Sequence, residues 1–200
     1  FGTGRHIEHL LERGVERIVG VDLSPTCVEK ARDRFGDDPR VVLHMGDLTS
    51  WRTGERFGAS ILLGNSFGDI IDPDLLLHVT HGMVNPLAHN GTFLMDYIGE
   101  NYLPRCHEGQ TVRWEADLHG TAVHDERTPR YDPSSQVMSI DVHARDRHTG
   151  QTVWRGMYQK AILSDTAVRT HFARVGMRIA AQGRATDLNP YYTNHTSELG

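Results

Sequence analysis

The feature that most constrains the fold of this 200-residue chain is a glycine-rich turn at its start. Phe1-Gly2-Thr3-Gly4 precedes an amphipathic segment, and the apolar run 18–21 that follows ends at Asp22. Glycines admit a ligand where a Cβ would collide, and the N-terminus of the next helix offers unpaired N–H groups and a positive dipole end. This order of turn, helix and strand is typical of a nucleotide pocket in a doubly wound, mostly parallel α/β sheet.

The kind of nucleotide that the pocket would bind is indicated by Asp22 and by the residue at position 7. Asp22 lies eighteen residues after Gly4, near the spacing at which a carboxylate at the end of the second strand binds a ribose. The dinucleotide pattern G-x-G-x-x-G, counted from Gly2, needs a small residue at position 7, where the chain has Ile7. A bulky residue there disfavours wrapping around the pyrophosphate of NAD(P) and favours S-adenosylmethionine (SAM), which has none. Alone, G-x-G would also fit a plain turn between strand and helix.

Three short motifs carry a resemblance to a known family. They are Gly2-Thr3-Gly4-Arg5-His6, Gly20-Val21-Asp22-Leu23-Ser24 and Gly46-Asp47-Leu48. Together they resemble the class I SAM-dependent methyltransferases, and more narrowly the small bacterial enzymes that methylate amino sugars and other metabolite acceptors. In that family an acidic residue and a glycine precede the Phe-Gly-Thr-Gly position, at the end of a central first strand. The resemblance therefore implies that a first strand is missing and that this sequence is a piece of a longer protein.

The resemblance assigns the cofactor site to loops that follow successive strands at the carboxyl edge of the sheet. It implies that Asp47 accepts a hydrogen bond from the adenine amino group and that the backbone at Leu48 meets the ring. Taken alone, Asp47 fits an ordinary turn carboxylate equally well. The loop 64–68 follows the apolar run 59–63, and we expect it at the methionine end of SAM rather than as a merely flexible loop. The expected cofactor-binding residues are Gly2, Thr3, Gly4, Asp22, Leu23, Gly46, Asp47, Leu48, Gly64, Asn65 and Ser66.

Hydrophobic periodicity divides the chain into an α/β part and an inserted sheet. After Tyr97 apolar and polar residues alternate, which indicates antiparallel strands. We expect a single SAM-binding domain over 1–200, with an antiparallel sheet inserted over 103–163. The resemblance implies that this sheet roofs the acceptor. The expected elements are helices over 5–13, 25–35 and 165–175 and one starting at 72–73, parallel strands over 18–21, 41–45, 59–63, 92–97 and 177–181, and antiparallel strands over 112–118, 138–144 and 152–163.

Methyl transfer from SAM needs a nucleophile aligned with the methyl carbon and water kept out. A hydroxyl acceptor needs a general base, whereas an amine needs only to arrive unprotonated or to lose its proton to a nearby acceptor. We expect Tyr97 or His107 to act in catalysis, although a structural or solvent-facing role is the plainer alternative for each. The candidate acceptor-binding residues are Phe67, Asn101, Trp114 and Tyr158, although Trp114 would equally serve as packing. His124, on the inserted sheet, is a weaker candidate for a catalytic role.

Composition excludes several other kinds of function. A formal charge of −5 without a basic block argues against a nucleic-acid partner. No apolar run approaches the roughly 20 residues that a membrane-spanning helix needs. Cys27 and Cys106 form neither a disulfide framework nor a zinc pattern, which fits a reducing cytoplasm. The free edges of the inserted sheet would allow two copies to pair as a homodimer.

The function expected from these observations is SAM-dependent methylation of a small-molecule amine, or secondly of a hydroxyl. An NAD(P)-dependent oxidoreductase is the first alternative, disfavoured by Ile7 and by the lack of a Tyr-x-x-x-Lys pair. A non-catalytic SAM-binding protein is the second alternative. No metal is expected, because the two histidine pairs at i, i+3 spacing, His6/His9 and His78/His81, lack a third ligand at a recognised spacing.

Overall fold

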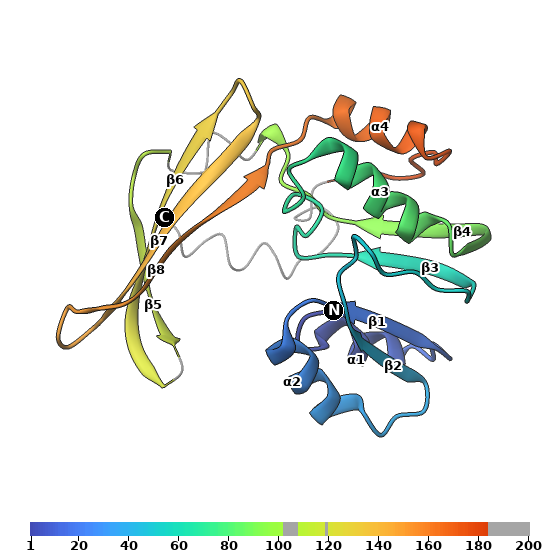
Figure 1. Ribbon diagram of the computed structural model, residues 1–200, viewed down its shortest axis with the longest axis horizontal. Helices are drawn as coiled ribbons and strands as arrows, with labels where there is room; N and C mark the ends of the chain where they lie inside the picture. Colours follow the sequence, from blue (N-terminus) through green and yellow to red (C-terminus); the bar gives the residue numbers. More distant parts are fainter. Residues whose placement is uncertain (102–107, 119, 184–200) are drawn as a thin grey trace. The chain divides into compact units, whose positions relative to one another are not determined.

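The computed structural model describes residues 1–101, 108–118 and 120–183, in two compact units, Phe1–Ser164 and Asp165–Gly200. The first unit starts with alternating helices and parallel strands and continues into an antiparallel sheet, in the order traced by the colours of Figure 1. Within the described ranges, no helix combines the length and the apolar character that crossing a membrane requires.

The α/β part of the first unit contains two parallel strand pairs. β1 pairs with β2 and β3 pairs with β4, as two separate two-stranded sheets. Four of the five predicted parallel strands therefore form, whereas one continuous sheet does not, and among the described residues β1 and β3 each have a single strand partner. The elements are α1 Arg5–Glu12, β1 Ile18–Asp22, α2 Pro25–Phe35, β2 Val41–Met45, β3 Phe57–Leu62, α3 Pro73–Val84 and β4 Leu87–Met95.

Local capping explains where the two longer helices of this part begin. Ser24 accepts a hydrogen bond from the backbone N–H of Cys27, and Pro25 occupies the first turn of α2, as the sequence predicts. Asp72 caps α3 in the same way by accepting from Asp74 and Leu75, again before a proline. These caps fix the helix starts close to the strands that precede them.

β4 begins earlier than predicted, because a bulge replaces the expected turn. Phe57 is opposite Leu87 and Ala59 is opposite Thr92, so the pairing of β3 and β4 slips between these two positions. Asn90 takes up the irregularity in the left-handed region, with φ 63°. The Asn-Gly signal at 90–91 thus marks a bulge within a strand and not its boundary.

The antiparallel sheet is a four-stranded meander in the order β5-β6-β7-β8. Three of its strands were predicted, but the prediction missed β6, whose centre is a run of charged and polar side chains that hides its alternation. Met138 and Ile162 are buried at one end of the sheet, where Ile98, Tyr131 and Ile140 pack against them. The strands are β5 Val112–Leu118, β6 Thr121–Asp132, β7 Val137–Asp146 and β8 Thr152–Ala161.

The second unit contains α4, Asp165–Arg174, with Val168 and Phe172 buried. The predicted final strand over 177–181 is wrong, since these residues adopt no regular structure and no described strand pairs with them. Instead the segment folds back along α4, where Gln182 donates to Asp165 at 2.9 Å and accepts from Arg169 at 2.7 Å. Without a neighbouring strand to take up the backbone N–H and C=O groups, apolar alternation alone does not make a strand.

Candidate functional site

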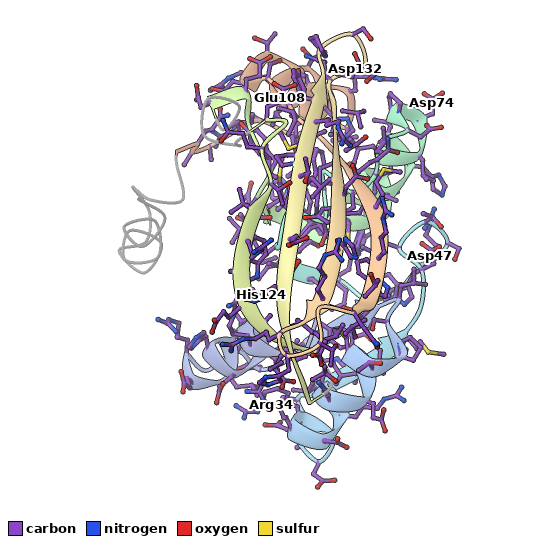
Figure 2. The ribbon with its side chains drawn as sticks, turned by 90° about the vertical axis from the view of Figure 1, so that its left-hand side faces the viewer. Arg34, Asp47, Asp74, Glu108, His124 and Asp132 are labelled. Carbon is purple, nitrogen blue, oxygen red and sulfur yellow. The ribbon has the colours of Figure 1, made fainter. Side chains whose placement is uncertain are left out.

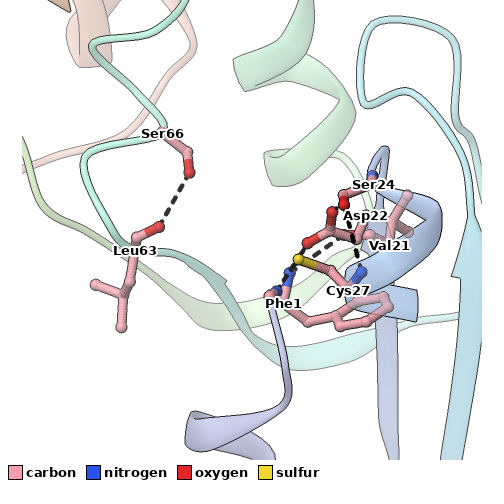
Figure 3. A network of polar contacts seen from close by, with 8 residues as sticks. Phe1, Val21, Asp22, Ser24, Cys27, Leu63 and Ser66 are labelled. Carbon is pink, nitrogen blue, oxygen red and sulfur yellow. Dashed lines mark hydrogen bonds and ion pairs between the residues drawn. The ribbon is translucent and has the colours of Figure 1, made fainter. Parts of the chain in front are cut away.

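Asp22, at the end of β1, holds the glycine turn that precedes α1 (Figure 3). Its Oδ2 accepts hydrogen bonds from the backbone nitrogens of Gly2, at 2.7 Å, and Phe1, at 3.0 Å. Its Oδ1 accepts from the backbone N–H of Ser24 at 2.9 Å. The two halves of the sequence motif, separated by a helix, are thus joined through one carboxylate.

The ionisation of Asp22 follows from these contacts. Partial burial, which leaves 19% of the side chain exposed, opposes the charged form. The backbone N–H groups of Ser24 and Gly2 donate to the carboxylate, and these hydrogen bonds help to lower the pKa of Asp22 below its ordinary value. The side chain is therefore a carboxylate at neutral pH. Its Oδ1 accepts one bond from the described residues, which leaves a lone pair for a ligand hydroxyl.

The two glycines of the turn have different roles. Gly4, with φ 88°, lies against α2, because a Cβ there would be 2.5 Å from Cε2 of Phe35. Gly2, with φ 58°, has no heavy atom within 4 Å of its Cβ position. Gly4 thus serves helix packing, whereas Gly2 leaves an open approach to the backbone, as a nucleotide ligand requires.

The end of β2 lies next to Asp22. The backbone N–H of Gly46 donates to the carbonyl oxygen of Asp22 at 3.0 Å. Asp47 is exposed and accepts from the backbone N–H of Thr49 at 2.8 Å, which lowers its pKa. Leu23, directly after Asp22, is 67% exposed. This edge therefore combines two carboxylates with an exposed apolar side chain, which suits an adenosine.

The loop after β3 is fixed by Asp96, a residue that the sequence analysis missed. Asp96 follows β4 and accepts from the backbone N–H groups of Gly64, at 3.1 Å, and Asn65, at 2.7 Å. Ser66 donates from its hydroxyl to the carbonyl oxygen of Leu63 at 3.1 Å (Figure 3). The signal that could have found Asp96 is an acidic residue directly after an apolar strand, the same pattern that drew attention to Asp22.

The candidates near this loop differ in accessibility. Phe67 is 1% exposed and belongs to the core, so its position favours packing over contact with a ligand. Tyr97 is half-buried directly after Asp96, and Asn101 is exposed. Thr3 is exposed, and its carbonyl oxygen accepts from Arg34 at 2.8 Å. His107 lies outside the described residues.

One face of the antiparallel sheet brings Trp114 and Tyr158 together around Arg127. The guanidinium carbon of Arg127 is 4.7 Å from the centroid of the Trp114 ring. Arg127 also donates to the hydroxyl of Tyr158 at 3.2 Å and forms an ion pair with Asp125 at 2.9 Å. We call Trp114, Arg127 and Tyr158, with Asp125, the aromatic–arginine group. It joins side chains from β5, β6 and β8.

His124 lies on the opposite face of the same sheet. It immediately precedes Asp125 on β6, and successive side chains of a strand point to opposite faces. Figure 2 labels His124 on the sheet, whose four strands lie side by side. The structure thus separates His124 from Trp114 and Tyr158, three residues that sequence analysis placed on one roof.

The end of β8 contacts the loop after β3. Lys160, two residues after Tyr158, forms an ion pair with Asp69 at 2.5 Å. The backbone N–H of Ala161 donates to the carbonyl oxygen of Gly68 at 2.7 Å. The strand that carries Tyr158 is therefore bonded directly to the loop that carries Asn65 and Ser66.

Two depressions in the surface of the described residues contain none of the predicted site residues. A depression of about 190 Å³ lies on the His124 face of the sheet and includes Glu126, Arg130 and Arg155. A second, of about 230 Å³, lies beside Arg52 and Pro86. Among the described residues no three His, Cys, Asp or Glu side chains gather as a metal site would require.

Comparisons with known proteins agree with this geometry. Residues 1–91, which include the glycine turn, Asp22, Asp47 and the loop after β3, match the model of a methyltransferase domain. The structure superposes on the CcbJ methyltransferase of Streptomyces caelestis with a TM-score of 0.73, covering 90% of this chain and 71% of that one at 18% identity. Residues 1–91 therefore match a methyltransferase domain, and the structure has the fold of the CcbJ methyltransferase.

Two further proteins that the chain resembles carry descriptive names. It is 26% identical, over 144 residues, to a dTDP-3-amino-3,6-dideoxy-alpha-D-glucopyranose N,N-dimethyltransferase of Streptomyces fradiae, covering 71% of this chain and 52% of that protein. SAM-bound CalS10 of Micromonospora echinaspora, an amino pentose methyltransferase involved in calicheamicin biosynthesis, shares the fold with a TM-score of 0.68 at 20% identity, over 88% of this chain and 71% of that one. The chain thus spans about half the length of the Streptomyces fradiae relative.

Proposed function

We propose that the protein transfers a methyl group from SAM to the amine of an amino sugar or a related metabolite. Two of the relatives named above, the Streptomyces fradiae dimethyltransferase and CalS10, are named as methyltransferases of amino sugars, and the residues described here suit both the cofactor and the acceptor. The observation that carries the proposal is the Asp22 carboxylate bonded to the glycine turn beside the open backbone of Gly2. An amine ranks ahead of a hydroxyl because it needs no dedicated general base.

In this proposal the loops at the strand ends hold the adenosine and the methionine part of the cofactor. Asp22 accepts from the ribose, while Asp47 and the backbone of Leu48 meet the adenine. Gly64, Asn65 and the neighbouring Ser66 lie toward the methionine end. Bound SAM supplies the methyl group as an electrophile on a positively charged sulfur. The remaining task of the chain is to align the acceptor nitrogen with that group and to exclude water.

The aromatic–arginine group is the proposed acceptor surface. Trp114 is 37% exposed, so part of its ring remains available for stacking against a sugar or a base. Arg127 uses some of its five N–H groups on Asp125 and Tyr158 and keeps others for oxygen atoms of the acceptor. Tyr97 and Asn101 remain proposed neighbours of the acceptor, as does His107.

Calorimetric titration of the protein with SAM and with NADH tests the cofactor. We expect SAM to bind and NADH not to bind, and we expect Asp22→Asn to weaken SAM binding about tenfold, since a charge-assisted hydrogen bond contributes about 1.5–3 kcal/mol. Asp38→Asn is the matched control, because Asp38 is also partly buried and bonds to Arg40 in the turn before β2, away from the loops. Binding of NADH in place of SAM would reverse the assignment to an oxidoreductase.

Mass spectrometry of amino sugar nucleotides incubated with protein and SAM tests the reaction. We expect the mass to rise by one methylene unit for each transfer and Trp114→Ala to raise KM for the acceptor more than KM for SAM. SAM binding without transfer to any amine or hydroxyl would favour a non-catalytic SAM-binding protein.

Two broader properties belong to the same proposal. We place the protein in a reducing cytoplasm, since Cys27 is a free thiol and the sequence contains no disulfide framework. We also propose one domain over 1–200, with a homodimer formed through the edges of the antiparallel sheet and no nucleic-acid partner. Light scattering of the purified protein tests the dimer, and a monomer at micromolar concentration would contradict it.

A further inference from the structure

A carboxylate after one parallel strand fixes the backbone of the loop after its neighbour. β3 and β4 pair in parallel, so their ends meet at one edge of their sheet. There the two oxygens of Asp96 accept separately from consecutive N–H groups, Oδ2 from Gly64 at 3.1 Å and Oδ1 from Asn65 at 2.7 Å. Hydrogen bonds to a charged acceptor are roughly twice as strong as those between neutral groups.

Asn65 completes the connection in the opposite direction. Its Oδ1 accepts from the backbone N–H of Ile98 at 3.0 Å, two residues beyond Asp96. Loop 64–66 and segment 96–98 are therefore bonded through three hydrogen bonds, each with a backbone N–H as donor. Within the described part of the chain, Nδ2 of Asn65 is buried without a hydrogen-bond partner, so the side chain is held there for its oxygen.

These hydrogen bonds stabilise an unfavourable backbone conformation at Gly64 and Asn65. Gly64 has φ 80° and Asn65 has φ 58°, two consecutive residues in the left-handed region. Glycine adopts this conformation freely, but a residue with a side chain does so at a cost of about 1 kcal/mol or more. This backbone strain at Asn65 disfavours the left-handed conformation of the loop. The hydrogen bonds from Asp96 offset the strain and so stabilise that conformation.

The shape matters because it exposes backbone. No heavy atom lies within 4 Å of the Cβ position of Gly64, so the peptide there is open to a close approach. At the far end of the loop, the carbonyl of Gly68 is bonded to Ala161. The loop is thus anchored at both ends and open at its start.

The charge of Asp96 also acts on His6, the second residue of α1. Burial and the charge of Arg5 lower the pKa of His6, and the negative charge of Asp96 opposes that shift.

We propose that Asp96 is a positioning residue of the cofactor site, which holds Gly64 and Asn65 in the conformation that receives the methionine end of SAM. The inference rests on the proposed function and deepens it. Asp96 acts through the loop backbone and is not a catalytic residue.

The variant Asp96→Asn keeps the size of the side chain but leaves one acceptor oxygen for two N–H donors. We expect about a tenfold rise in the dissociation constant and the KM for SAM, with KM for the acceptor unchanged within twofold. Hydrogen exchange of residues 64–68 should become faster. Asp146→Asn is the matched control, because Asp146 also accepts from two backbone N–H groups, those of His148 and Thr149, in the turn between β7 and β8. This control should bind SAM within twofold of wild type.

Each outcome bears on a separate claim. Wild-type protein that does not bind SAM would contradict the proposed function, and hydrogen exchange would still test the role of Asp96 in the loop. Wild-type affinity in Asp96→Asn, or an equal loss in Asp146→Asn, would overturn the role of Asp96. If Asp96→Asn fails to fold, NMR of the wild type decides. The amide protons of Gly64 and Asn65 should then be protected from exchange with solvent, as hydrogen-bonded amides are, and unprotected exchange would overturn the inference.

Discussion

Replacing each glycine of the first turn by alanine should separate cofactor binding from stability. Both positions have positive φ, so either alanine costs about 1–2 kcal/mol in backbone strain, partly offset by the restricted unfolded chain. At Gly4 the new Cβ would also lie 2.5 Å from the ring of Phe35, and overpacking of this kind typically costs about 1–3 kcal/mol. At Gly2 nothing lies within 4 Å.

The difference between the two variants isolates the packing effect, because backbone strain and the unfolded-state contribution are common to both. We expect Gly4→Ala to have a free energy of unfolding about 1–3 kcal/mol below that of Gly2→Ala, measured by urea denaturation with unchanged slope. SAM titration should show the larger loss of affinity in Gly2→Ala. We expect its dissociation constant for SAM to be at least tenfold above that of wild type. Equal stabilities, or wild-type SAM affinity in Gly2→Ala, would refute the assignment of packing to Gly4 and ligand approach to Gly2.

Three further predictions follow from single side chains. The pKa of Asp22 is lowered in the folded state from an ordinary 3.8. Its ionisation therefore stabilises the fold above pH 3.8, and this stabilisation is lost as the pH falls through the folded pKa. The difference in unfolding free energy between wild type and Asp22→Asn should shrink below about pH 4. Phe67→Ala should lower the free energy of unfolding by about 3–5 kcal/mol in urea denaturation, and a loss below about 1 kcal/mol would contradict its burial. Hydrogen bonds from the Ser134 and Ser135 side chains lower the pKa of Asp132 to about 2, and carboxyl NMR should show this pKa rising toward 3.8 in Ser134→Ala.

The elements that sequence predicted best are those in which local and tertiary signals agree. Ser24-Pro25 supplies a cap and a first turn, Val28 and Ala31 supply the buried stripe, and α2 spans the predicted residues. The glycine turn and Asp22 were likewise predicted together, because a fixed motif encodes their chemistry and the helix length brings them back to one place.

The parts that sequence missed depend on partners far along the chain. β6 has polar residues at its centre because Asp125 and Arg127 pair with each other on one face and Glu126 accepts from Arg113 and Arg145 on the other. No local pattern reveals such pairing. Residues 177–181 are the opposite case. Their apolar alternation predicts a strand, but no described strand pairs with them and they form none.

Asp96 went unnoticed for a related reason. Its function is to accept from Gly64 and Asn65, which lie about thirty residues earlier in the chain. An acidic residue after a strand is a common turn feature, and only the pairing of β3 with β4 gives it those partners.

The meander order of β5 to β8 has a consequence for how the molecule folds. Every strand of that sheet pairs with the next one in the chain, whereas β3 and β4 meet only after the intervening α3 has formed a crossover. Contacts between near neighbours in sequence form faster than distant ones, because less chain entropy is lost before they are made. The meander can therefore assemble early and independently, and hydrogen-exchange labelling during refolding should find its amides protected before those of the parallel pairs.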